Sequence, residues 1–164
     1  MPDTILETNM ERVAECQCWQ LKAIARGEPS SNYLCHCKAC QRRSGSAIQW
    51  GMRWEKHQVR LEGQTKVYAR KADSGFEIRY FFCPNCGSTI FAESDRTPEF
   101  CAVPAGCFAD PGLPAPTISV WEGSMRSAHH VRRDKAALFQ RVQAPPGDRS
   151  SRKQPEQAWR RRNV

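Results

Sequence analysis

The chain has 164 residues, of which 40% are hydrophobic and 26% are charged, and this length is typical of one ordinary domain. No stretch approaches the roughly 18 consecutive apolar residues that a membrane-spanning helix needs. The opening sequence MPDTILETNMERVAEC contains acidic residues and lacks the apolar run of a signal peptide. We therefore expect a soluble, cytoplasmic protein whose cysteine thiols stay reduced.

The net charge of +8 is concentrated at one end of the chain. Residues 1–125 contain 14 basic and 14 acidic side chains, whereas residues 126–164 contain 11 basic and 3 acidic ones. A neutral body with a basic tail differs from a uniformly basic protein that binds nucleic acid along its whole surface.

Short runs of alternating apolar and polar residues predict a mainly β domain over residues 11–142. The predicted strands cover residues 19–25, 46–54, 59–61, 66–69, 76–82, 88–92, 100–103 and 118–121. The third and fourth of these runs flank the turn residues Glu62 and Gly63, which predicts a hairpin. The one helical turn predicted before residue 130, Lys38–Arg43, lies inside a cysteine cluster.

The two ends of the chain carry weaker signals. Residues 1–10 show no apolar period, so we expect a flexible N-terminus. The stretch 134–142 is compatible with one helix. Residues 143–164 are rich in Pro, Ser, Gln and Arg, and they contain too few apolar side chains to offset the entropy of ordering, which predicts a disordered basic tail.

Nine cysteines are present, which is an odd number, and the chain is too long for a small disulfide scaffold. Seven of them form short arms: Cys16-x-Cys18, Cys35-x-Cys37, Cys37-x-x-Cys40 and Cys83-Pro84-Asn85-Cys86-Gly87. Tetrahedral zinc sites are commonly assembled from two such arms. The CPNCG arm resembles a zinc knuckle, and Phe81 and Phe82 before it are expected to end a strand.

The arm at residues 35–40 differs in kind, because it places three cysteines at a strand end that runs into a helical turn. Three protein ligands with one open position are the arrangement of catalytic zinc. A helix N-terminus nearby also stabilises thiolate charge. The count therefore suggests four ligands in one site and three in the other.

Spacing leaves the pairing of the arms open. A single zinc held by Cys35, Cys37, Cys83 and Cys86 satisfies the same rules. A redox pair of the thioredoxin type is less favoured for the CPNCG arm, because no βαβ pattern surrounds it. The remaining two cysteines, Cys101 and Cys107, are isolated, and we interpret them as small buried hydrophobic residues.

These residues resemble the glutathione-dependent formaldehyde-activating enzyme family, which includes the centromere protein V type. The matching segments are CQC (16–18), CHCKACQRRSGSA (35–47), ADSG (72–75), FFCPNCGSTIF (81–91), PAGCFADP (104–111) and ISVW (118–121). The resemblance covers about two thirds of the chain, and the combination of segments is specific although each CxxC alone is not.

The resemblance implies a β-tent fold of short antiparallel sheets and a definite division of the ligands. A structural zinc would be held by Cys16, Cys18, Cys83 and Cys86, and a catalytic zinc by Cys35, Cys37 and Cys40. The namesake activity adds the thiol of glutathione to formaldehyde to give S-hydroxymethylglutathione, and it is classed as a carbon–sulfur lyase for the reverse direction.

Side chains around the three-cysteine arm are candidates for binding glutathione. Lys38, Arg42 and Arg43 are placed to attract its carboxylates, and Ser44 to shape the pocket, although a solvated helical face explains the same charges. His36 lies between two ligands, so its side chain is expected to point away from the metal.

One segment departs from the family pattern. Many members have a tryptophan after the strand at 118–121, where this chain reads SMRSAHHV with His129 and His130. If that segment lines the pocket, the substrate differs from glutathione.

Three function classes follow from the sequence. The leading hypothesis is a zinc-dependent carbon–sulfur lyase-type enzyme with two zinc ions, acting on thiol–aldehyde adducts. The alternative is a non-enzymatic, zinc-stabilised binding module whose basic tail, with Trp159 beside Arg160–Arg162, contacts nucleic acid. A redox enzyme acting through Cys101 or Cys107 ranks last, because neither residue has an activating neighbour in the sequence.

Overall fold

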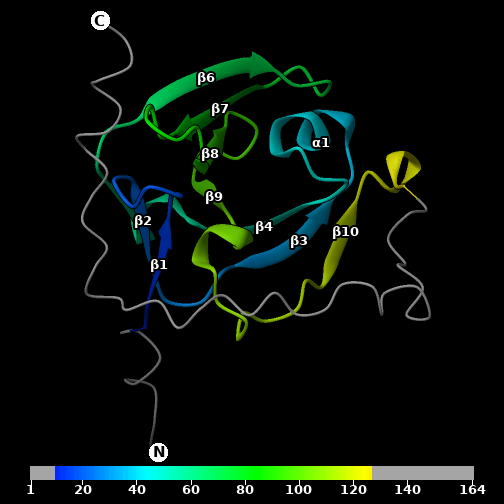
Figure 1. The fold of residues 1–164 in the computed structure, drawn as a ribbon. Coiled ribbons are helices and arrows are strands. Elements are labelled where there is room, and N and C mark those ends of the chain that lie inside the picture. The colour runs from blue at the N-terminus through cyan, green and yellow to red at the C-terminus, as the bar shows by residue number, and fades with distance from the viewer. Residues whose placement is uncertain (1–9, 127–164) are drawn as a thin grey trace, which may run out of the picture. The chain divides into compact units, whose positions relative to one another are not determined.

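Ten strands and one α-helix make up the part of the chain that the computed structural model describes, residues 10–126 (Figure 1). The strands are β1 (Glu11–Glu15), β2 (Lys22–Arg26), β3 (Ser31–Cys35), β4 (Gln49–Glu55), β5 (Val59–Glu62), β6 (Lys66–Lys71), β7 (Glu77–Phe82), β8 (Thr89–Ser94), β9 (Phe100–Pro104) and β10 (Ile118–Val120). The helix is α1 (Lys38–Ser44), and short 3-10 turns cover Lys56–Gln58, Ala105–Phe108 and Glu122–Ser124. The prediction of a mainly β protein with one helical turn at residues 38–43 is confirmed.

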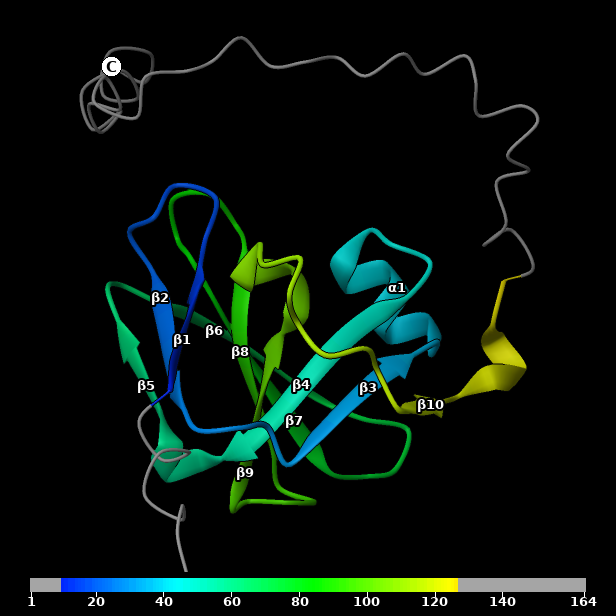
Figure 2. The same cartoon turned by 90° about the horizontal axis from the view of Figure 1, so that it is seen from below.

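The strands form two sheets. A three-stranded antiparallel sheet has the order β1-β2-β5, and a seven-stranded sheet has the order β10-β3-β4-β9-β8-β7-β6. Neighbours in the large sheet are antiparallel, except that β10 runs parallel to β3. Figure 2 shows the small sheet on one side of β8 and β9 and the helix α1 on the other. This two-sheet architecture agrees with the β-tent that the resemblance implies.

The hydrophobic core lies between the two sheets. Because side chains alternate across a strand, Met52 and Trp54 of β4 point to one face, where both are fully buried with Leu21 and Ile90. The Trp54 indole also donates a hydrogen bond to the carbonyl oxygen of Gly27 at 3.1 Å. One face of the large sheet thus packs into the core, and the opposite face is available to line a cavity.

The predicted hairpin across Glu62 and Gly63 is wrong. β5 pairs with β2 in the small sheet, whereas β6 pairs with β7 in the large one. Gly63 has a φ of +100°, and a Cβ placed on it would lie 1.9 Å from the Gln20 carbonyl oxygen. The turn is therefore pressed against the β1–β2 loop, and from there the chain crosses between sheets instead of folding back.

Two predicted strands begin later than expected. The run 19–25 becomes a strand at Lys22, because Trp19 has a φ of +60° and its N–H donates to the Cys16 carbonyl in a turn. The run 46–54 becomes a strand at Gln49, after the turn that follows α1 at Gly45, where φ is +68°.

Several expectations lie outside the described residues. They are the flexible N-terminus, the helix at 134–142, the basic tail and the pair His129 and His130. Among residues 10–126, no helix is long and apolar enough to cross a membrane.

Candidate metal centres and the adjoining cavity

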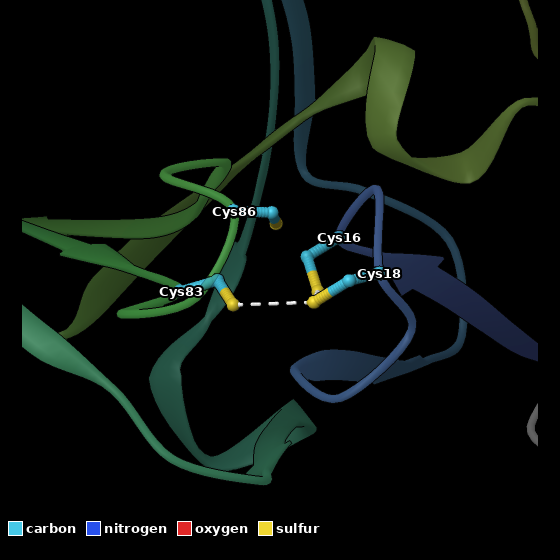
Figure 3. Close-up of side chains that lie close together, drawn as sticks. All are labelled: Cys16, Cys18, Cys83 and Cys86. Atoms are coloured by element: carbon cyan, nitrogen blue, oxygen red, sulfur yellow. Dashed lines mark hydrogen bonds between the residues drawn. The ribbon is translucent and has the colours of Figure 1, made fainter. Parts of the chain in front are cut away.

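Four cysteines from two loops meet in one cluster. Cys16 and Cys18 lie on the loop after β1, and Cys83 and Cys86 lie on the loop between β7 and β8, with the two loops facing each other (Figure 3). The four Sγ atoms all lie within 4.8 Å of one another. The alternative that joins the CPNCG arm to Cys35 and Cys37 is therefore wrong, because those residues belong to a different cluster.

Local hydrogen bonds shape each loop so that its sulfur atoms face the partner loop. The Leu21 N–H donates to Cys16 Sγ at 3.3 Å, and the Cys16 N–H donates to the Leu21 carbonyl. In the other loop, the Cys83 N–H donates to the Ser88 carbonyl at 2.9 Å. Gly87 adopts a φ of +77°, a conformation that favours glycine and lets the knuckle close.

Gln20 connects this cluster to the crossover between the sheets. Its side-chain amide nitrogen donates to Cys83 Sγ at 3.1 Å and to the Gln64 carbonyl at 2.8 Å. Its side-chain oxygen accepts from the Gln64 N–H at 3.1 Å. Such outer contacts orient ligating sulfur atoms and tune the metal that they hold.

The thiols of this cluster differ in acidity. Burial raises the pKa of Cys16 to about 12. Burial also opposes ionisation of Cys86, but hydrogen bonds with the side chain and backbone of Ser88 outweigh it and lower its pKa to about 6. Four sulfur donors in so small a space are the ligand set of a closed zinc site, so these residues fit a structural zinc.

A second cluster contains Cys35, Cys37 and Cys40, whose Sγ atoms also lie within 4.8 Å of one another. Cys35 ends β3, Cys37 caps the helix α1 by accepting a hydrogen bond from the Cys40 N–H at 3.3 Å, and Cys40 lies in the first turn. A hydrogen bond with Cys40 lowers the pKa of Cys35, and the same pairing raises that of Cys40. Within residues 10–126, no further His, Cys, Asp or Glu side chain joins these three sulfur atoms as a ligand.

His36 lies between two of these ligands but does not belong to the cluster. It is buried, and its backbone N–H donates to the Val120 carbonyl of β10 at 3.0 Å. The backbone between Cys35 and Cys37 is therefore fixed to the edge strand of the large sheet.

A cavity of about 560 Å³ opens beside the three-cysteine cluster, on the face of the large sheet that does not enter the core. This volume is within the range of small-molecule sites. All three cysteines of the second cluster line it, together with Tyr33, Arg43, Gln49, Arg53, Arg70 and Tyr80. None of the four cysteines of the first cluster does so. The two clusters thus differ as a closed site and an accessible one.

The structure separates the four predicted glutathione contacts. Arg43 lines the cavity, whereas Lys38, Arg42 and Ser44 are exposed and lie outside its lining. The Ser44 hydroxyl instead donates to the Cys40 carbonyl at 2.8 Å, on the backbone of its own helix.

Sequence reasoning missed three arginines of the cavity, Arg53, Arg70 and Arg96. Arg53 lies on β4 and Arg70 on β6, far from the cysteine arm in sequence. The signal for Arg53 is the alternation of β4, since Gln49, Gly51 and Arg53 share the face opposite the core tryptophan. No comparable signal identifies Arg70.

The family described as glutathione-dependent formaldehyde-activating enzyme matches residues 11–124. The chain belongs to this family. The matched region contains every strand of both sheets, both cysteine clusters and the segments that line the cavity.

Solved structures also resemble this chain. A crystal structure of a Rhodobacter sphaeroides protein, a structural genomics target, aligns with a TM-score of 0.50 at 16% sequence identity, covering 65% of this chain and 98% of that one. At this identity the likeness supports the fold alone. No curated protein matches the chain.

Of the two cysteines outside the clusters, Cys101 is buried in the core and Cys107 is partly buried against it. Burial raises the pKa of Cys101 to about 12 and that of Cys107 to about 11. Reactive cysteines need the opposite shift, because the thiolate is the nucleophile. This finding argues against the redox hypothesis.

The absence of a side chain at Gly51 leaves room for the ring of Tyr33, which lines the cavity. Gly51 is its partner across the β3–β4 ladder, and a Cβ on Gly51 would lie 2.5 Å from the ring carbon and hydroxyl oxygen at the tip of Tyr33. Burial raises the pKa of Tyr33 to about 12, against the charge of Arg53, which acts to lower it. The Tyr33 phenol therefore keeps its proton at neutral pH.

Proposed function

We propose that the protein is a zinc-dependent carbon–sulfur lyase-type enzyme that acts on thiol–aldehyde adducts, with glutathione and formaldehyde as the first substrates to test. The observation that carries the proposal is the three-cysteine cluster, which opens onto a cavity in a member of the formaldehyde-activating family. Fewer than four protein ligands leave room for substrate, as in catalytic zinc sites.

The two clusters would take different roles. Cys16, Cys18, Cys83 and Cys86 would hold a structural zinc, and Cys35, Cys37 and Cys40 the catalytic one. A zinc ion held by the second cluster would supply Lewis-acid chemistry, lowering the pKa of a bound thiol and polarising a carbonyl oxygen. The all-sulfur donor sets of both clusters fit this metal.

Tyr33 and Arg43 would carry the remaining steps. Addition of a thiol to an aldehyde forms one sulfur–carbon bond and moves the thiol proton to the carbonyl oxygen, so no oxidant or reductant is consumed. Tyr33 lines the cavity, and its protonated hydroxyl would donate a hydrogen bond to the oxygen as its charge develops.

Arg43 is the predicted glutathione contact that we place in the site. Its side-chain nitrogen Nη2 donates to Gln49 Oε1 at 2.9 Å, which holds the guanidinium at the cavity wall near Cys40. There it would bind a substrate carboxylate. Contacts from Lys38, Arg42 and Ser44 stay predictions, which depend on a substrate that extends beyond the cavity.

The experiment is an exchange measurement by NMR on glutathione and formaldehyde, with the rate compared to the uncatalysed background. Cys37→Ala should return the rate to background, whereas Cys107→Ala, which removes a thiol outside both clusters and outside the cavity lining, should leave it unchanged. Wild-type protein loaded with zinc that fails to exceed the background with any thiol and formaldehyde would contradict the proposal.

A second candidate function rests on the charge of +8 that residues 126–164 carry. Nucleic-acid binding through this tail predicts salt-dependent binding to DNA. Deletion of residues 143–164 should abolish that binding, and binding that persists in the deletion would refute the assignment to the tail.

A further inference from the structure

Basic side chains outnumber acidic ones around the cavity. Arg43, Arg53, Arg70 and Arg96 line it, against Asp73 and Glu93. Glu93 is already neutralised, because it forms ion pairs with Lys56 at 2.7 Å and with Arg79 at 3.6 Å. The cavity wall therefore carries a net positive charge.

None of these four arginines has a carboxylate partner. Among the described residues, no acidic oxygen lies within 4.0 Å of Arg43, Arg53, Arg70 or Arg96. Arg79, which lies outside the cavity lining, pairs with three carboxylates. Arg43 also has a buried Nε atom without a hydrogen-bond partner. An unsatisfied buried donor on a charged group is costly, so the Arg43 guanidinium is held at the cavity wall with part of its hydrogen-bonding capacity unused.

Three of the four guanidinium groups, those of Arg43, Arg53 and Arg70, come from a helix or a strand and are held by neutral contacts. Arg43 of α1 stacks on the Tyr80 ring at 4.6 Å from its centroid, and Arg53 of β4 lies 5.6 Å from the centroid of Phe100. Arg70 of β6 donates to the Lys71 carbonyl at 2.9 Å. Stacking fixes the plane of a guanidinium while leaving N–H groups on its edge available to a carboxylate.

Positive side chains beside the second cluster would offset the negative charge of its cysteines. Three cysteine thiolates outweigh the charge of one divalent ion, so the second cluster stays negative when it is loaded. An anionic substrate is repelled by that charge unless nearby side chains offset it. Arg43 is placed to supply part of this compensation, because it lies on the same helix as Cys40 and lines the same cavity.

We infer that Arg43, Arg53 and Arg70 form a carboxylate-binding wall that determines specificity, selecting thiol substrates that carry two carboxylates over neutral thiols. The thiol part of this inference rests on the proposed function, whereas the binding of carboxylates to the wall does not. Arg53 and Arg70 are the specificity residues that local sequence around the cysteines does not reveal.

The test is calorimetric binding of S-methylglutathione, whose sulfur is blocked and whose two carboxylates are free, compared with its diethyl ester. Wild-type protein should bind the diacid at least about tenfold more tightly than the ester, because each charged hydrogen bond that is lost weakens binding by roughly that factor. Arg53→Gln and Arg70→Gln should each remove most of the difference. Lys71→Gln changes the neighbouring exposed cation outside the cavity lining and should not alter it.

Arg53→Lys keeps the charge but not the planar fork, and should recover only part of the affinity. Circular dichroism of each variant separates loss of binding from loss of fold. Equal binding of diacid and ester, or unchanged binding in folded Arg53→Gln and Arg70→Gln, overturns the inference. Selective binding of the diacid without any thiol–aldehyde exchange would refute the proposed reaction but not the inference. Exchange at equal rates with glutathione and 2-mercaptoethanol would refute the inference but not the proposed reaction.

Discussion

Replacing Gly63 by alanine tests whether the crossover between the sheets supports the four-cysteine centre. Gly63 has a φ of +100°, and an added Cβ would lie 1.9 Å from the Gln20 carbonyl oxygen and 3.0 Å from the Leu21 Cα. Both contacts are to backbone, so no side chain can rotate away. The loop that contains Cys18 and Gln20 must move by about an ångström or more to reach an ordinary contact distance.

The cost has two parts. An L-residue at positive φ costs roughly 1–2 kcal/mol, and the forced displacement of packed backbone adds roughly 1–3 kcal/mol. Restriction of the unfolded chain by the methyl group returns about 0.4–1 kcal/mol. We expect a loss of about 3 kcal/mol in the free energy of unfolding, or about 12 °C in Tm for a folded region of this size.

Gly75→Ala is the matched control. Gly75 has a similar φ of +85°, but nothing lies within 4 Å of an added Cβ. It should therefore lose only about 1 kcal/mol, from the backbone conformation alone. Urea denaturation and zinc affinity measured on both variants separate the two parts, and only Gly63→Ala should release zinc more readily. Equal destabilisation of the two variants, with equal retention of zinc, would refute the role assigned to the crossover.

Three further predictions concern the centres themselves. Cys16→Ala should remove one zinc per chain and destabilise the protein strongly, whereas Cys101→Ala, equally buried, should keep full zinc content and lose about 1–2 kcal/mol; equal metal content in both variants would contradict this. Gly51→Ala should displace the Tyr33 ring and lower the exchange rate at least about tenfold with little change in zinc content, and an unchanged rate would remove Tyr33 from the mechanism. Because the pKa of Cys16 is raised to about 12 while that of Cys86 is lowered to about 6, the first is a thiol and the second a thiolate at pH 7.5. Zinc binding must then displace the Cys16 proton, so zinc affinity should rise with pH and be lost on acidification; calorimetry in buffers of different ionisation enthalpy should detect at least one proton released, and no release would contradict the assignment.

The cysteine arms show how far sequence reasoning reaches. Spacing predicted that Cys83 and Cys86 bind metal, because short two-cysteine arms have few other uses in a reduced chain. Spacing alone could not identify their partners. Cys16 follows a strand of the small sheet and Cys83 follows a strand of the large sheet, so their proximity depends on how the two sheets pack. The family resemblance supplied that division, and the sulfur atoms lie in the same two groups, of four and of three.

Long-range pairing accounts for what was missed. The turn at Glu62 and Gly63 was recognised, but a turn signal does not say which strands it joins, and here it joins two sheets. Arg70 reaches the cavity because β6 lies beyond β7 in the large sheet, a consequence of register that no local pattern contains. Arg42, by contrast, adjoins the cysteines in sequence and is exposed on a helix whose other face meets the cavity.

The division of seven cysteines into a closed and an open centre is tested most directly by the zinc content of the purified chain, measured together with that of Cys37→Ala. We predict two zinc ions per wild-type chain and one per chain of the variant, which should still unfold cooperatively. One zinc per wild-type chain, retained in full by Cys37→Ala, would contradict the existence of the open centre.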